Sequence, residues 1–73
     1  MPHIEIHVLE GVFDAGDKQR ILTSVMRAFG EAAGGRIYEN TAVRIIEVPS
    51  GNWGFAGQIL RTDDGLRIKS ATG

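Results

Sequence analysis

The sequence predicts an α/β (α+β) fold: a single β-α-β unit with parallel strands plus a short C-terminal hairpin, assembled into an oligomer. Two observations predict the unit. A strand pattern and a long helical pattern open the chain, and a second strand pattern begins at Ala42. Two strands of one sheet joined by a helical crossover are parallel, and the crossover is right-handed. At 73 residues the chain is one domain, with a core at residues 2–58 and a tail at 59–73.

The first strand is indicated by a period-2 pattern directly after Pro2. Apolar Ile4, Ile6 and Val8 share one side, and His3, Glu5, His7 and Leu9 share the other. Proline cannot donate a hydrogen bond to a strand ladder, so it belongs at the first position of a strand or on an edge. Pro2 is therefore expected at the start of this strand.

A helix is expected at about residues 15–33. Asp14 is a good N-cap, and Asp17 adds a carboxylate to the first turn. Gly30 weakens the last turn, and Gly34-Gly35 provide a left-handed stop. The helical spacing places these apolar residues on one broad face: Ile21, Leu22, Val25, Met26, Phe29, Ala32 and Ala33.

The second strand is predicted at residues 42–48 and is closed by Pro49-Ser50-Gly51. The glycine-punctuated residues 52–57 indicate a tight turn or a short strand. In the tail, apolar runs on both sides of Asp63-Asp64-Gly65 predict a small hairpin, with a terminal helix as the alternative.

Residues 42–48 carry branched apolar side chains on both faces, but one helix can cover only one face of a two-stranded sheet. The second face and the strand edges would stay exposed in a monomer. The C-terminal hairpin can cover part of them, but its pattern is short and half polar. A homo-oligomer is therefore expected, and subunit boundaries are natural places for a pocket.

Composition excludes several classes of function. The net charge is −1 with 23% charged residues of both signs, which does not indicate nucleic-acid binding. There is no cysteine, and no stretch has the length of a membrane span or the pattern of a signal peptide, so a cytoplasmic protein is expected. His3 and His7 share a strand face but lack a third ligand, which favours polar contacts at a subunit boundary over a metal site.

Pro2 is the first candidate catalytic residue. Initiator methionine is usually removed before a small residue, and removal of Met1 would leave a secondary amine on a rigid strand. A free α-amino group has a pKa of about 7.7–8.0, and burial or a nearby guanidinium lowers it, so the amine can act as a base near neutral pH. The alternative is that Pro2 merely starts an edge strand.

Arg44 and Trp53 are the other singled-out positions. An arginine within an apolar strand is costly unless it is paired or faces a cleft, and its planar fork suits a carboxylate or an enolate oxygen. A salt bridge to Glu5, to Glu47 or to a neighbouring subunit explains Arg44 equally well. Trp53 can form the wall of a small apolar pocket, although most aromatic residues in such positions simply pack at an interface.

Together these residues resemble the tautomerase superfamily, specifically the short 4-oxalocrotonate tautomerase group. The resemblance covers roughly residues 2–58 and is carried by Met1-Pro2, by the strand IEIHVLEG at residues 4–11, by YENT at 38–41 before Val43-Arg44-Ile45, and by GNWGFAG at 51–57. It implies a β-α-β subunit, typically in a hexamer built as a trimer of dimers. It also implies that Pro2 is a general base needing no cofactor or metal, that Arg44 holds the substrate's acid end from a neighbouring subunit, and that Trp53 is the aromatic pocket wall.

The sequence departs from that group at Val12, where typical members carry a second arginine that grips the far carboxylate of a diacid. A mono-acid such as an arylpyruvate enol would need only Arg44 and an apolar pocket of Val12, Phe13 and Trp53. Lys18, Arg20 or Arg61 are possible replacements for the missing charge. Phe55 stands where dehalogenating and hydrating relatives need a carboxylate, which disfavours that chemistry.

The expected function is therefore cofactor-independent keto–enol tautomerisation of a small 2-oxo acid or its enol. Two alternatives stay open. Pro2 can instead be a nucleophile that forms an iminium with a carbonyl substrate, or the chain can be a non-catalytic oligomeric binding module.

Overall fold

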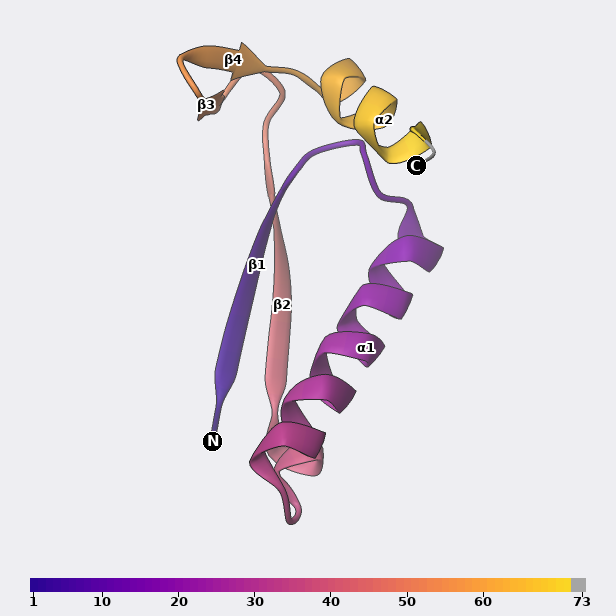
Figure 1. Cartoon of the computed structure of the whole chain (residues 1–73), viewed down its shortest axis with the longest axis vertical. Helices are drawn as coiled ribbons and strands as arrows, with labels where there is room; N and C mark the ends of the chain where they lie inside the picture. The colour runs from indigo at the N-terminus through magenta and orange to yellow at the C-terminus, as the bar shows by residue number, and fades with distance from the viewer. Residues whose placement is uncertain (72–73) are drawn as a thin grey trace.

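The computed structural model of the chain describes residues 1–71. Figure 1 shows a parallel pair of strands flanked by one long helix, followed by a small hairpin and a second helix. The elements in chain order are β1 (His3–Leu9), α1 (Ala15–Ala33), the 3-10 turn η1 (Ile37–Asn40), β2 (Ala42–Val48), β3 (Trp53–Phe55), β4 (Gln58–Leu60) and α2 (Thr62–Ser70). The predicted α+β class, with a parallel β-α-β unit and a hairpin in the C-terminal part, is confirmed.

β1 and β2 pair in parallel from His3 opposite Ala42 to Leu9 opposite Val48. Residues opposite each other in such a pair share a face of the sheet. Glu47 lies opposite Val8 and forms an ion pair with Lys18 of α1, so this is the face toward the helix. Alternation along the strands then places Arg44, opposite Glu5, on the outer face, which α1 does not cover.

The helix α1 has the boundaries that its caps predict. The Asp14 side chain accepts a hydrogen bond from the Asp17 N–H (2.8 Å), and the Asp17 side chain accepts one from the Asp14 N–H (3.0 Å). This reciprocal pair satisfies two helix N–H groups that have no partner within the helix. Gly34 ends the helix with a positive φ of 83°, a conformation that glycine adopts without steric cost.

Gly30 is a packing residue rather than a weak point of α1. A Cβ at this buried position would fall 2.5 Å from Tyr38 Cβ and 2.7 Å from Tyr38 Cα. Such distances are well inside van der Waals contact, so only glycine lets η1 approach the helix this closely. The sequence pattern showed the low helix propensity of Gly30 but not this contact.

The hairpin predicted around Asp63-Asp64-Gly65 is wrong, and the alternative of a helix is right. The hairpin lies earlier, between β3 and β4, and these acidic residues belong to the first turn of α2. The Asp64 side chain accepts a hydrogen bond from the Arg61 N–H (2.8 Å), which caps the helix, and carboxylates are stabilised near the positive end of a helix dipole.

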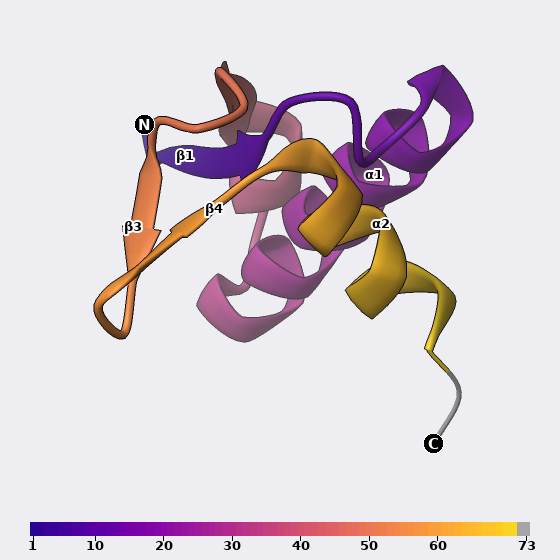
Figure 2. The ribbon, with the colours of Figure 1, turned by 90° about the horizontal axis from the view of Figure 1, so that it is seen from above.

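The chain buries little apolar surface by itself. Among residues 1–71, only Leu9 and Val12 are buried apolar side chains, and no side chain is less than 2% exposed. The radius of gyration is 14.5 Å, whereas a compact chain of this length has about 11 Å. Figure 2 shows why, because α1 lies on one side of the strand pair and the β3–β4 hairpin projects on the other. No helix in the described part of the chain is both long and apolar enough to cross a membrane.

Candidate active site

Pro2 lies directly before β1, at the N-terminal end of the strand. Its carbonyl accepts a hydrogen bond from the Ala42 N–H (3.0 Å), so the residue is fixed at the start of the strand ladder, and it is half-buried. Met1 is 94% exposed, which leaves the bond between Met1 and Pro2 accessible. While Met1 is attached, the Pro2 nitrogen is an amide without basic character. Removal of Met1 would turn this nitrogen into a secondary amine on a fixed backbone.

Arg44 lies exposed on the outer face of the strand pair. Within residues 1–71 it forms no salt bridge, although Glu5 is its register partner. Glu47 is engaged elsewhere, since it accepts from Lys18 Nζ (2.9 Å) and from the Gly11 N–H (3.3 Å). The two partners within the chain that could have explained Arg44 are therefore not used, and its guanidinium faces the surface that α1 leaves open.

The three predicted pocket residues surround one cavity at the other end of β1. This cavity has a volume of about 290 Å³. Its lining is apolar except for one ammonium group, and includes Leu9, Val12, Phe13, Trp53, Leu60, Ile68 and Lys69. Such a lining can hold a small apolar group of a ligand and can exclude water from it.

The helix α2 forms one wall of the cavity because it is tied to the end of β1. Thr62 donates its hydroxyl to the Glu10 carbonyl (2.7 Å), and the Thr62 N–H donates to Ser50 Oγ (3.0 Å). A Cβ at Gly65 would fall 2.4 Å from Val12 Cγ2, so α2 lies directly on Val12. Val12, 5% exposed, is consequently buried beneath α2.

Lys69 is the charged residue of the cavity lining, and the sequence did not indicate it. Its Nζ donates to the Val12 carbonyl (3.0 Å) and to Asp17 Oδ2 (2.5 Å), and lies 5.5 Å from the centre of the Phe13 ring. The hydrogen bond from Lys69, followed by that from the Asp14 N–H, lowers the pKa of Asp17 to about 2. No local pattern could have revealed Lys69, because its contacts with Asp17 and Val12 span 52 and 57 positions.

The three cations considered as replacements for the missing arginine do not line this cavity. Lys18 pairs with Glu47, and Arg20 pairs with Asp17 on the exposed side of α1. Arg61 contributes to the capping of α2, and its side chain lies near Gly51. Lys69 is therefore the cation that the fold places beside Val12.

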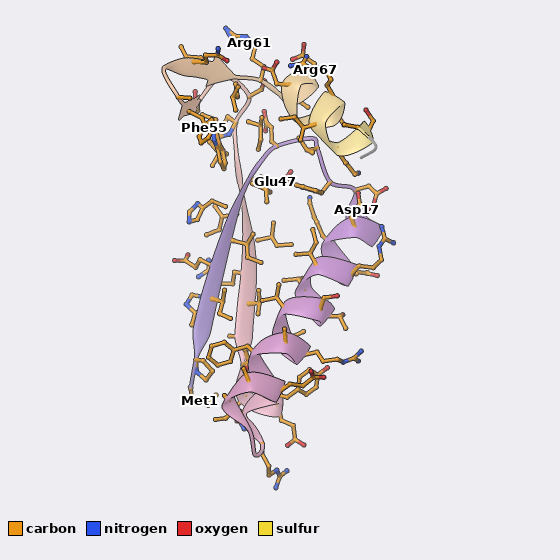
Figure 3. All side chains as sticks on the ribbon, viewed as in Figure 1. Met1, Asp17, Glu47, Phe55, Arg61 and Arg67 are labelled. Carbon is orange, nitrogen blue, oxygen red and sulfur yellow. The ribbon has the colours of Figure 1, made fainter. Side chains whose placement is uncertain are left out.

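The predicted catalytic and pocket residues are not brought together within one chain. Five residues of β1, 3–7, lie between Pro2 and the first cavity-lining residue, Val8, and the six strand steps from Pro2 to Val8 span roughly 20 Å. Figure 3 shows the separation, with Met1 at one end of the strand pair and Asp17, Glu47 and Phe55 toward the other. A site that uses both groups needs a second copy of the chain.

Other parts of the surface hold fewer features of a site. A second hollow, of about 380 Å³, lies at the end of α1 and is lined by Arg27, Glu31, Tyr38 and glycines, none of which the sequence singles out for chemistry. In the described part of the chain, no group of three or more His, Asp or Glu side chains is arranged to hold a metal ion.

Comparison with known proteins places the fold. The sequence matches no family model, and it matches none of the curated proteins. A structure from a study of the 4-oxalocrotonate tautomerase isozymes of Methylibium petroleiphilum matches with a TM-score of 0.72 and 28% identity, over 96% of this chain and 100% of that chain. The structure of YwhB, a homologue of 4-oxalocrotonate tautomerase, matches with a TM-score of 0.69 and 27% identity, over 86% of this chain and 97% of that chain. The chain is therefore a 4-oxalocrotonate tautomerase-like member of the tautomerase superfamily.

Proposed function

We propose that this protein is a cofactor-independent keto–enol tautomerase acting on a small 2-oxo acid or its enol, with Pro2 as the general base. The position of Pro2 carries the proposal. Its carbonyl is held by the Ala42 N–H at 3.0 Å, so a freed nitrogen would sit on a fixed backbone at the end of the strand pair. General bases need this fixed placement within hydrogen-bond reach of the proton that they remove.

The chemistry follows from the properties of a secondary amine. An α-amino group has a pKa of about 7.7–8.0, and partial burial or a neighbouring guanidinium favours its neutral form. The neutral nitrogen would accept a proton from the enol hydroxyl or the α-carbon of the substrate. The resulting ammonium would return a proton to the other position, so the step needs no redox partner and leaves the enzyme unchanged.

Arg44 is proposed to hold the acid end of the substrate. A guanidinium binds a carboxylate through two parallel hydrogen bonds and stabilises the negative charge that develops on an enolate oxygen. Support comes from its exposure on the outer face and from the absence of a salt bridge to it within residues 1–71. The Arg44 guanidinium is thus available to a substrate bound between subunits.

The proposed active unit is an oligomer, a hexamer built as a trimer of dimers. The sparse burial of apolar side chains in the isolated chain and the uncovered outer face of the strand pair support association of several copies, and the number six follows from the resemblance to the 4-oxalocrotonate tautomerase group. A second copy running head to tail would bring its Pro2 toward the cavity of Val12, Phe13 and Trp53. The substrate would then lie with its acid end near Pro2 and Arg44 and its apolar body in the cavity.

The proposal is tested by intact mass and by the ketonisation rate of phenylenolpyruvate. We expect the mass of a chain without Met1, and we expect Pro2→Ala to lower kcat/KM by about 100-fold or more, in the range of general-base catalysis. Pro49→Ala is the matched control, because Pro49 is the other of the two prolines in the chain and should tolerate replacement. Unchanged turnover in Pro2→Ala would reject the assigned role. Borohydride trapping of a substrate adduct would instead indicate the iminium route.

A further inference from the structure

The apolar cavity contains one cation, and the fold already neutralises it. Lys69 is the charged residue among the cavity-lining side chains, and its ammonium donates to Asp17 Oδ2 at 2.5 Å and to the Val12 carbonyl at 3.0 Å. We propose that Asp17 sets the charge of the substrates that this cavity accepts: by holding Lys69, it makes the cavity select an uncharged apolar group and disfavour a second carboxylate. This inference rests on the proposed function and names the substrate class, an aryl or alkyl 2-oxo mono-acid.

A carboxylate is costly to place in this cavity. Moving an ionised carboxylate from water into apolar surroundings is expensive unless a cation and hydrogen bonds compensate for the lost water. Of the side chains of Leu9, Val12, Phe13, Trp53 and Ile68, only Trp53 has a hydrogen-bond donor, its indole N–H, and none is charged. The Lys69 ammonium is therefore the only cation in the lining that could compensate a carboxylate.

Two of the three N–H donors of Lys69 are already used. An ammonium has three N–H donors and no acceptor. One donates to Asp17 and one to the Val12 carbonyl, while the cation also lies 5.5 Å from the centre of the Phe13 ring, within the range of a cation–π contact. A substrate carboxylate would have to compete with the carboxylate of Asp17 for the same charge.

Asp17 is itself held in place. Its side chain is 15% exposed, accepts from the Asp14 N–H at 3.0 Å as part of the helix cap, and pairs with Arg20 through its other oxygen. Its pKa, lowered to about 2 chiefly by the Lys69 hydrogen bond, keeps the carboxylate charged at neutral pH. Asp17 therefore does not release Lys69 under ordinary conditions.

The packing of α2 explains why position 12 cannot provide the missing charge. Val12 is 5% exposed and lies against Gly65 so closely that even a Cβ at Gly65 would meet it at 2.4 Å. An arginine at position 12 would have to displace α2. The same helix brings Lys69 to the Val12 carbonyl. Thus α2 occupies the space that a longer side chain at position 12 would need, and it also contributes a cation that Asp17 neutralises.

A matched pair of substrates tests the inference directly. Phenylenolpyruvate and its 4-carboxy derivative share the acid end and differ only in a charge at the tip that would enter the cavity. We expect the wild-type protein to favour the unsubstituted compound by about tenfold or more in kcat/KM, and Asp17→Asn to shift this ratio about tenfold toward the 4-carboxy compound. The asparagine keeps the size of the side chain and an oxygen for the Asp14 N–H, while it frees the charge of Lys69.

The double variant Asp17→Asn with Lys69→Met identifies the freed charge as the cause. Methionine keeps the apolar stem of Lys69 without its ammonium, so the double variant should lose the gain for the 4-carboxy compound. A gain that persists without Lys69 would overturn the proposal. Wild-type preference for the 4-carboxy compound would also overturn it, and that measurement does not depend on any variant folding.

A binding measurement separates this inference from the proposed function. Trp53 is the single tryptophan of the chain and lines the cavity, so its fluorescence reports occupancy without turnover. Phenylacetate should bind more tightly than 4-carboxyphenylacetate to the wild-type protein, and Asp17→Asn should narrow the difference. If neither enol is turned over but the two acids still differ in this way, the proposed function fails and the charge selection stands. Equal affinity of the two acids for the wild-type protein would reject the charge selection whatever the activity.

Discussion

Gly65 of α2 and Val12 of the loop after β1 lie in direct contact, with a Cβ at Gly65 placed 2.4 Å from Val12 Cγ2. This contact lets α2 lie flat on the end of the β-α-β unit. It buries Val12, completes the apolar cavity and positions Lys69 against Asp17. The C-terminal helix is thus part of the candidate site, although it lies beyond the region that carries the sequence resemblance.

Gly65→Ala should therefore destabilise the protein. Overpacking against buried Val12 costs about 1–3 kcal/mol, and the better helix propensity of alanine returns about 1 kcal/mol, so we expect a net loss of about 1 kcal/mol. The urea midpoint at fixed protein concentration measures it. Gly54→Ala is the control, because the nearest atom to a Cβ there is 4.0 Å away. Equal midpoints for Gly65→Ala and the wild-type protein would show that α2 does not press on Val12.

Gly30→Ala should cost more than Gly65→Ala. The new methyl group would meet the Tyr38 backbone at 2.7 Å, and a backbone cannot move aside as a side-chain methyl can. We expect η1 to separate from α1, with a larger fall in the urea midpoint and faster amide hydrogen exchange in η1. Faster exchange spread evenly over the chain, with no excess in η1, would contradict this explanation.

The pH dependence of stability should reveal Asp17. Hydrogen bonds lower its pKa from 3.8 to about 2, chiefly through Lys69. A carboxyl whose pKa is lowered by folding contributes stability above its unfolded pKa, and this contribution is lost as the pH falls through its folded pKa. The wild-type protein should thus unfold at a higher temperature than Asp17→Asn at pH 7, and the difference should shrink between about pH 4 and pH 2. A difference that stays constant over this range would show that the ion pair does not act in solution.

A composite site makes a prediction about mixed assemblies. If Pro2 and Arg44 of one site come from different subunits, refolding a mixture of Pro2→Ala and Arg44→Ala chains should produce some sites with both native residues. The activity of the refolded mixture should rise well above that of either variant alone. The control is a mixture of the two variants that were refolded separately and then combined. Failure to recover activity in the refolded mixture would indicate that both residues act from the same subunit.

The sequence could predict what local chemistry decides. Alternation after Pro2, the Asp14 cap and the Gly34 stop defined β1 and α1, and the structure confirms their positions. The sequence could not decide the secondary structure of Asp63-Asp64-Gly65, because these residues suit both a hairpin turn and the first turn of a helix. Capping by Asp64 and packing on Val12 favour the helix, and packing depends on contacts distant in the sequence.

The candidate site was predictable only in parts. Val12, Phe13 and Trp53 were expected to share a pocket, and the structure places them around one cavity. Lys69 could not be found, because the contact with Asp17 spans 52 positions. Within one chain β1 separates Pro2 from that cavity, so a site that includes both depends on the proposed assembly.

The most direct test of the account is a nitrogen NMR titration of the assembled protein labelled with ¹⁵N-proline. Of the two prolines, Pro49 has an amide nitrogen that should not titrate, which provides an internal reference. We predict that the Pro2 nitrogen titrates as an amine with a pKa below the ordinary value of about 7.7, and that the same pKa governs kcat/KM. A Pro2 nitrogen that does not titrate, or that titrates at or above that ordinary value, would contradict its role as the base.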